Sequence, residues 1–194
     1  MNDIVVKDLC KNFGEKRVLN RFSAVFPAER VTCVMGKSGC GKTTLIQILL
    51  GLETPDAGSI MGVPERVSAV FQEDRLCEEF SAAGNIRLVT GGQVPQEQIV
   101  SCLSAFGLSG EAQTPVREMS GGMKRRVAIA RAVLADGELL VMDEPFKGLD
   151  TGTRAAVAQE LRRRFAGRTV ILVTHSPEEA ALFDAEVIRM EEIR

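Results

Sequence analysis

Short runs of apolar residues, each bounded by polar or glycine-containing turns, recur along the chain. Runs of this length are typical of strands, and those without polar alternation are typical of strands that are buried on both faces. Among them, 31–35, 139–142 and 169–173 have the character of buried strands. The expected strands are residues 4–6, 22–26, 31–35, 67–71, 139–142, 169–173 and 186–190, the last at a sheet edge.

Segments with helical spacing alternate with these strands, and the first of them follows a glycine-rich loop and ends at Gly51. Strand, glycine loop and helix in this order begin a parallel α/β unit. Residues 75–118 are richer in Ala, Ser and Gln, and we expect a small helical subdomain there. The prediction is one domain over residues 1–194, with an α/β core at about 1–74 and 119–194. The expected helices are 43–50, 98–106, 123–134, 153–165 and 178–183.

The length and composition of the chain fit one globular domain, and they argue against a nucleic-acid partner and a membrane-spanning segment. The chain has 194 residues, of which 45% are hydrophobic, and a net charge of −2, which gives no reason to expect a nucleic-acid partner. No apolar run approaches the roughly 18–20 residues that span a bilayer, and the N-terminus does not resemble a signal peptide. The five cysteines form no close pair and have no nearby histidine, so we expect reduced thiols and no zinc site.

Two basic runs, residues 124–126 (Lys-Arg-Arg) and 162–164 (Arg-Arg-Arg), interrupt the helical segments. Neither run is interleaved with aromatic residues, which a nucleic-acid surface would favour. We therefore expect both runs to be solvated faces of helices.

A phosphate-binding loop lies at residues 36–43, where Gly-Lys-Ser-Gly-Cys-Gly-Lys-Thr matches G-x-x-x-x-G-K-[ST] in full. The glycines let several backbone N–H groups point at one anion, and the following helix adds its positive dipole end. Lys42 supplies charge for the β- and γ-phosphates, and the Thr43 hydroxyl can bind Mg²⁺. Kinases, GTPases, helicases and transporters all carry this motif. The expected nucleotide-binding residues here are Gly36, Lys37, Ser38, Gly39, Cys40, Gly41, Lys42, Thr43 and Thr44.

Two carboxylates follow the apolar run Leu-Leu-Val-Met at residues 139–142. A buried strand that ends in Asp143 brings its carboxylate to the carboxyl edge of the sheet, where it would hold Mg²⁺, largely through water. Glu144 is then placed to orient and polarise the attacking water.

Between these two motifs, residues 119–123 (Met-Ser-Gly-Gly-Met) resemble the signature sequence of ABC transporter ATPases, usually Leu-Ser-Gly-Gly-Gln. Because of this motif and the two motifs on either side of it, the chain resembles the nucleotide-binding subunit of an ABC transporter. The resemblance covers nearly its whole length. Ser120, Gly121 and Gly122 can offer a hydroxyl and backbone N–H groups at a helix start. The resemblance implies that they meet the γ-phosphate held by the second subunit of a head-to-tail dimer.

The other family motifs occur in the expected order. By resemblance, Gln72 in Phe-Gln-Glu belongs to the Q-loop and would complete the Mg²⁺ and water environment. Asp150 in Gly-Leu-Asp belongs to the D-loop, which crosses the dimer interface. His175 matches the switch histidine that contacts the γ-phosphate. Phe13 falls where the family places an aromatic ring on adenine, and packing in the core is its alternative.

The resemblance implies an α/β fold with a P-loop NTPase (RecA-like) core, an N-terminal antiparallel β subdomain and a small inserted helical subdomain. It implies ATP and Mg²⁺ as cofactors and a nucleotide-dependent homodimer that hydrolyses ATP to power transport. A transmembrane permease would hold it on the cytoplasmic face of the membrane, and an extracytoplasmic substrate-binding protein would complete the system. No nucleic acid is expected.

The motifs are closest to importers of the nitrate, sulfonate and taurine type, which also carry Met at position 123. That group commonly has Pro where this chain has Asp74, and Gly-Ala-Leu-Asp where this chain has Lys-Gly-Leu-Asp at residues 147–150. These differences leave the transported substrate open. We also expect no room for a C-terminal regulatory domain. An ABC exporter subunit and a soluble ABC ATPase are alternatives, and a small-molecule kinase would leave the signature unexplained.

Leu76, Phe80 and Ile86 are the expected lining of a permease groove, or else part of the subdomain core.

Overall fold

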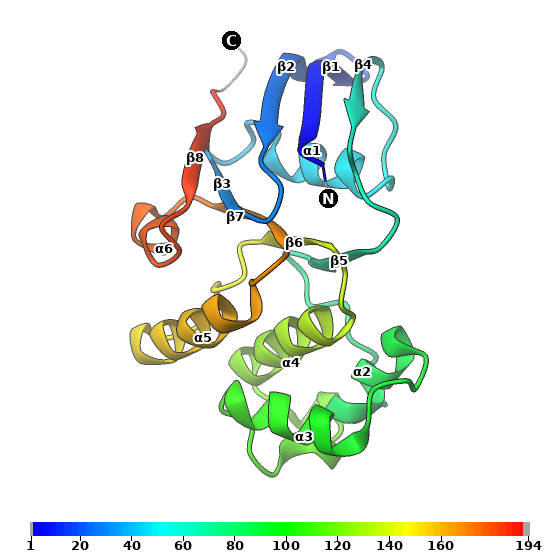
Figure 1. The fold of residues 1–194 in the computed structure, drawn as a ribbon, viewed down its shortest axis with the longest axis vertical. Helices are drawn as coiled ribbons and strands as arrows, with labels where there is room; N and C mark the ends of the chain where they lie inside the picture. The colour runs from blue at the N-terminus through cyan, green and yellow to red at the C-terminus, as the bar shows by residue number, and fades with distance from the viewer. Residues whose placement is uncertain (1, 192–194) are drawn as a thin grey trace.

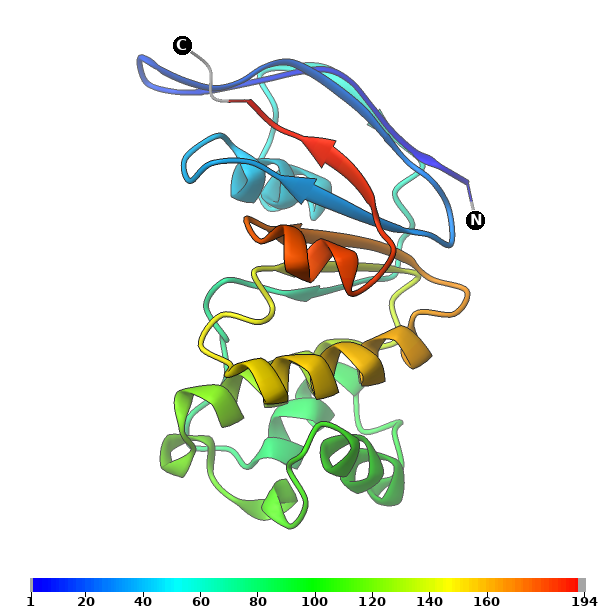
Figure 2. The same cartoon turned by 90° about the vertical axis from the view of Figure 1, so that its left-hand side faces the viewer.

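The computed structural model describes residues 2–191, and its layers are stacked along the long axis of the molecule (Figure 1). A three-stranded antiparallel sheet forms one end, a five-stranded sheet lies across the middle, and short helices form the other end. Figure 2 shows helix α1 (Lys42–Leu49) between the two sheets and α5 (Thr151–Arg164) on the opposite side of the five-stranded sheet. The structure therefore has two interiors, one on each face of that sheet.

The N-terminal sheet has the order β2-β1-β4, and both of its pairings are antiparallel. Its long hairpin turns at Gly14, which has φ +60°, so that Phe13 pairs with Lys16 at the tip. The tip lies over the phosphate loop, because residues of both hairpin strands line the cavity there. The strands are β1 (Ile4–Phe13), β2 (Lys16–Phe26) and β4 (Ala57–Met61).

The central sheet is entirely parallel and has the order β5-β6-β7-β3-β8. Alternate side chains of its middle strands enter the two interiors. In β6, Leu139 and Val141 pack with α1, whereas Leu140 and Met142 pack with α4 and α5. Burial on both faces explains why these strands are apolar without interruption. They are β3 (Val31–Met35), β5 (Val67–Val70), β6 (Leu139–Asp143), β7 (Thr169–Thr174) and β8 (Glu186–Arg189).

The remaining helices cover the far side of the central sheet or flank its edge. Ser81, Ser120 and Asp150 each cap a helix by accepting a hydrogen bond from a backbone N–H three residues later. None of the helices in residues 2–191 is long and apolar enough to cross a membrane. The elements are α2 (Ala82–Thr90), α3 (Gln96–Ala105), the 3₁₀ turns η1 (Glu111–Gln113) and η2 (Val116–Glu118), α4 (Gly121–Leu134) and α6 (Pro177–Ala181).

The α/β fold, the parallel core sheet and the N-terminal antiparallel sheet are confirmed. Every strand and helix expected from the sequence is present, and β8 lies at a sheet edge as expected. Strand β4 and helix α2 were not predicted. The division of the chain into an α/β core and a helical subdomain at about 75–118 stays a prediction. The predicted domain runs from 1 to 194, and its Met1 and residues 192–194 lie outside the described residues.

The carboxyl ends of four parallel strands place the site. Because β5, β6, β7 and β3 are neighbours in that order, the segments that follow them meet along one edge. Near the starts of these segments lie Gln72, Glu144, His175 and the phosphate loop at 36–41. Ligands of open α/β sheets bind at this edge.

Candidate functional site

The phosphate loop connects β3 to α1 and is held between two other segments. Gly41, the residue before α1, has φ +100°, and a Cβ there would lie 2.7 Å from the carbonyl oxygen of Val18. A Cβ on Gly36 would lie 2.5 Å from the carbonyl oxygen of Met190. Both positions therefore require glycine, which keeps the loop backbone close to the hairpin on one side and to the end of β8 on the other.

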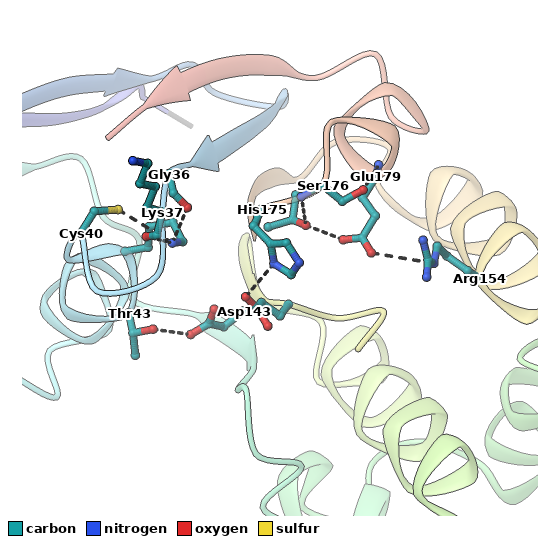
Figure 3. Close-up of polar contacts among 12 residues, drawn as sticks. Gly36, Lys37, Cys40, Thr43, Asp143, Arg154, His175, Ser176 and Glu179 are labelled. Carbon is teal, nitrogen blue, oxygen red and sulfur yellow. Dashed lines mark hydrogen bonds and ion pairs between the residues drawn. The ribbon is translucent and has the colours of Figure 1, made fainter. Parts of the chain in front are cut away.

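Lys42 closes the loop on itself. Its Nζ donates hydrogen bonds of 2.8 Å to the carbonyl oxygens of Gly36 and Lys37 and lies 3.8 Å from Sγ of Cys40 (Figure 3). The side chain is buried, as is Cys40. A buried ammonium whose oxygen partners are backbone carbonyls is suited to exchange one of them for an anionic phosphate oxygen.

Thr43 and Asp143 join the start of α1 to the end of β6. The Thr43 hydroxyl donates a 3.0 Å hydrogen bond to Oδ2 of Asp143, which is 3% exposed (Figure 3). Burial raises the pKa of Asp143, and the hydrogen bond from Thr43 acts in the opposite direction. Oxygen donors of this kind suit Mg²⁺, which binds through few protein groups and keeps water and phosphate ligands. Within residues 2–191, no cluster of three or more His, Cys, Asp and Glu side chains is placed to hold a metal alone.

Glu144 and His175 meet at the ends of β6 and β7. Nδ1 of His175 lies 3.1 Å from Oε1 of Glu144 (Figure 3). The backbone of Glu144 has φ +47°, an unfavourable region for a side chain of this size, and its N–H donates a 2.8 Å hydrogen bond to Val173. Backbone strain held in place by its surroundings is a feature of functional sites.

Most of the predicted site residues line one cavity of about 470 Å³. Phe13 lies at the rim of the cavity and is 47% exposed, so the alternative prediction that it packs in the core is wrong. Lys16 and Val18 of β2 also line the cavity but were not predicted. Their signal in the sequence is Gly14, the turn of a hairpin that brings them beside Phe13. The predicted residues in the lining are Phe13, Ser38, Gly39, Gly41, Lys42, Thr43, Thr44, Gln72, Asp143, Glu144 and His175.

The remaining predicted residues lie outside this lining. Gly36, Lys37 and Cys40 belong to the phosphate loop and contact Lys42. Ser120 caps α4 by accepting from the N–H of Met123, and Asp150 caps α5 by accepting from the N–H of Thr153. Ser120, Gly121, Gly122 and Asp150 do not line the cavity.

The basic run at 124–126 is not a solvated face. Arg125 is 3% exposed and points into the protein, and Arg126 is half-buried with hydrogen bonds to the carbonyls of Phe106 and Gly107. Lys124 is also half-buried, in an ion pair with Glu78, so that prediction is wrong for this run. It holds for the exposed Arg162 and Arg163, while Arg164 is half-buried against Glu160.

A second polar network fixes the segment that carries His175. Thr174 donates a 2.5 Å hydrogen bond to the buried carboxylate of Glu179, and the N–H of Ser176 donates to Thr174 Oγ1 at 3.1 Å. Arg154 of α5 lies 3.8 Å from the same carboxylate group (Figure 3). This network connects the helix capped by Asp150 to the residue before His175. Sequence reasoning missed Glu179, because nothing local distinguishes it from Glu178.

Comparison with known proteins identifies relatives of the whole chain. The family model described as ABC transporter matches residues 19–147. An aliphatic sulfonates import ATP-binding protein, SsuB, from Pseudomonas fluorescens is 37% identical over 97% of this chain and 74% of its own length. A protein of the same name from Rhodococcus jostii is 38% identical over 95% of this chain and 78% of its own length.

Solved structures show the same fold. The dimeric structure of a bacterial ABC transporter cassette has a TM-score of 0.87 and 25% identity, and the match covers 97% of this chain and 94% of that one. A bacterial ABC exporter with ATP bound also has a TM-score of 0.87, at 21% identity, over 100% of this chain and 38% of that chain.

Proposed function

This chain belongs to the ABC transporter family, and we propose that it is the ATP-hydrolysing subunit of a bacterial importer. The observation that carries the proposal is the single cavity into which four strand ends bring the phosphate loop, Gln72, Glu144 and His175. The relatives named as import ATP-binding proteins support import over export.

The phosphate loop would hold the triphosphate of ATP. Its backbone N–H groups and the start of α1 favour an anion, and Lys42 would give up its bonds to the loop carbonyls for the β- and γ-phosphates. Phe13, exposed at the rim of the cavity, would present its ring to the adenine.

Thr43 and Asp143, with Gln72 beside them, would hold Mg²⁺. The adjacent hydroxyl and carboxylate oxygens fit this ion, and a cation would offset the cost of keeping the Asp143 carboxylate charged while it is buried. When bound, the ion supplies charge neutralisation to the phosphate oxygens.

Glu144 would act on the attacking water. Its strained backbone and its contact with His175 aim the carboxylate at the region beyond the phosphate loop. The carboxylate would accept a hydrogen bond from the water and orient it in line with the γ-phosphate. His175 would donate to the γ-phosphate while its position is fixed by Glu144 and by the Glu179 network.

A second copy of the chain would complete the site. Ser120, Gly121 and Gly122 do not line the cavity of their own chain, although they present a capped helix start. We place them against the γ-phosphate of the partner subunit in a nucleotide-dependent, head-to-tail homodimer. The match to a dimeric cassette supports this arrangement.

The permease would dock beside the Q-loop. Ile86 is fully buried, so the expectation that it lines a groove is wrong, whereas Leu76 is half-buried against the core and Phe80 is exposed. A second groove of about 610 Å³ runs between the central sheet and the helical region. It contains Phe71, next to Gln72, and the exposed side chains of Leu52 and Val89. A cytoplasmic helix of the permease with an apolar face fits this groove.

In this proposal the permease holds the chain on the cytoplasmic face of the membrane, and an extracytoplasmic binding protein delivers the cargo. The names of the relatives point to aliphatic sulfonates as that cargo.

Two assays test the proposed function. The purified chain with ATP and Mg²⁺ should release phosphate without any acceptor, which a small-molecule kinase would not do. Deletion of the gene in its source organism should abolish growth on an alkanesulfonate as the only sulfur source, while growth on sulfate is unchanged. Normal growth of the deletion strain on the sulfonate would contradict the cargo, and absence of acceptor-free hydrolysis would contradict the enzymatic role.

A further inference from the structure

Arg125 projects from the first turns of α4 into the space between two loops of the nucleotide site. Its guanidinium carries five N–H donors, and five hydrogen bonds leave it, so none of its polar hydrogens lacks an acceptor. A charge that is 97% buried is tolerated only with such complete pairing. The side chain is therefore confined to one position.

The five bonds reach two separate segments. Three go to consecutive carbonyl oxygens at the end of β6, namely those of Asp143 at 2.7 Å, Glu144 at 2.7 Å and Pro145 at 2.9 Å. Two go to the segment that contains Gln72, at 2.6 Å to the carbonyl of Phe71 and 3.0 Å to the carboxylate of Asp74. One side chain thus joins the backbone of the predicted catalytic carboxylate to the backbone beside Gln72.

The bonds fall at two places where the backbone is strained. Glu144 has φ +47° and Arg75 has φ +47°, and left-handed backbone is unfavourable for such residues. Arg125 holds the carbonyl of Glu144 itself and that of Phe71, with Asp74 directly before the second strained residue. Within residues 2–191, no other residue of α4 donates a hydrogen bond to the carbonyls of Asp143, Glu144 or Pro145.

We propose that Arg125 is a positioning residue that holds Glu144 and Gln72 in place for hydrolysis and couples both to α4, the helix that Ser120 caps. Its hydrogen bonds to the predicted site residues Asp143 and Glu144 go to their backbone carbonyls and not to their side chains. Loss of Arg125 should therefore lower the rate of turnover and leave the affinity for ATP unchanged. Because α4 starts at the signature residues, movement of that helix on ATP-driven closure would be passed to both loops at once. This inference rests on the proposed role of Glu144.

Arg131 provides a matched comparison on the same helix. Its guanidinium donates to the Q-loop side, at 2.9 Å to the carbonyl of Asp74 and 2.6 Å to that of Arg75, and within residues 2–191 to no acceptor at 143–146. Loss of Arg131 should therefore loosen residues 71–76 alone, whereas loss of Arg125 should loosen residues 71–76 and 143–146 together. Arg163, exposed on α5, is a control for the removal of one positive charge.

The first test is hydrogen–deuterium exchange, which does not depend on activity. Arg125→Gln should speed amide exchange in both segments, Arg131→Gln in the first only, and Arg163→Gln in neither. Unchanged exchange at 143–146 in Arg125→Gln would overturn the proposal. If that variant does not fold, Arg125→Lys gives the same comparison, because a lysine cannot serve two loops with a planar fork.

The second test is steady-state ATP hydrolysis. Arg125→Gln should lower kcat about 10- to 100-fold, the scale of a small misplacement of catalytic groups, and leave the KM for ATP nearly unchanged. Asp74→Asn keeps the four carbonyl bonds and should have a much smaller effect. A residue that only stabilises the fold would lower the Tm but not kcat per ATP-binding site, and that result would overturn the proposal. Wild-type chain without hydrolysis would instead refute the proposed function, while the exchange experiment still decides the role of Arg125.

Discussion

Oε1 of Glu144 and Nδ1 of His175 lie 3.1 Å apart, although the two residues come from different strands and are 31 positions apart in the sequence. The contact is possible because β6 and β7 pair in parallel with Asp143 opposite Val173. The parallel register thus places a carboxylate and an imidazole side by side at the mouth of the phosphate loop.

Glu144→Gln should keep ATP binding and lose most hydrolysis. The amide preserves the size of the side chain but cannot accept a proton from water, and a positioned base is worth about 10²-fold or more. Phosphate release and binding of a fluorescent ATP analogue should be measured on the same preparation. Glu97→Gln, on the exposed surface of α3, is the control; turnover of Glu144→Gln close to that of wild type would refute the role.

Phe13→Ala should raise the KM for ATP and leave kcat nearly unchanged. Loss of a stacking ring costs about 1–3 kcal/mol of binding, and the 47% exposure of Phe13 means that little core packing is lost with it. Phe13→Tyr retains a ring and should behave like wild type. An unchanged KM in Phe13→Ala would show that adenine binds elsewhere.

Lys42→Ala should weaken ATP binding and abolish turnover, because the triphosphate would lose its cation in the loop. Ser120→Arg should abolish turnover by blocking the partner's site. If each site is shared between two subunits, a mixture of the two inactive chains should recover part of the activity, because the mixed dimer keeps one intact site.

The mixture should be titrated at constant total protein, with ultracentrifugation of Glu144→Gln in ATP to detect the dimer directly. If the chain remains a strict monomer and its specific activity does not change with protein concentration, the model of a site shared between two subunits is refuted.

Charged substitutions in the groove beside the Q-loop should abolish permease association and spare basal ATP hydrolysis. Leu52→Glu and Val89→Glu each place a carboxylate on an exposed apolar position of that groove, where it would have to be desolvated on binding. Phe80→Glu tests the surface expected from the sequence. Val100→Glu on α3 is the control, since it is exposed but lies outside both. Co-purification unaffected by all three changes would place the permease elsewhere.

Asp56 should make part of the stability depend on pH. Hydrogen bonds from the backbone and side chain of Asn12, at 2.7 and 2.8 Å, are the main reason that the pKa of Asp56 is lowered, with Lys11 contributing less. A lowered folded-state pKa means that the stabilisation is complete above the ordinary aspartate value of about 3.9. It is lost as the pH falls through the lower, folded-state value.

Asp56→Asn should therefore lower the Tm at neutral pH and show a smaller further decrease on acidification than wild type. Thermal unfolding at several pH values from about 7 to 3 measures this difference. Parallel curves for the variant and wild type would show that the contact with Asn12 does not stabilise the fold.

Local motifs were sufficient for the parallel core and most of the cavity, because phosphate loops and acidic strand ends are read from consecutive residues. Strand β4, with Gly58 and Ser59, has little strand character of its own and forms by pairing with β1. Helix α2 contains Gly84 and Asn85 and is fixed by contacts to the loop before it, as Asn85 binds the backbone of Cys77.

Arg125 illustrates the limit of local sequence reasoning most clearly. In a run of three basic residues it has the character of a solvated position, yet its acceptors come from segments about 20 and 50 residues away. Only the pairing of β5 with β6 brings those carbonyls together. A charge pattern along one helix contains no information about such acceptors.

The strand order also determines when the phosphate loop can first become ordered during synthesis. Strand β3 carries the loop, and its two partners in the described sheet are β7 and β8, whose residues lie more than 130 positions later. Until the ribosome has released those strands, β3 has two open edges, and contacts this distant in sequence form slowly. A nascent chain of this kind depends on protection from aggregation for most of its synthesis, and nucleotide binding would mark the chains in which the sheet has closed.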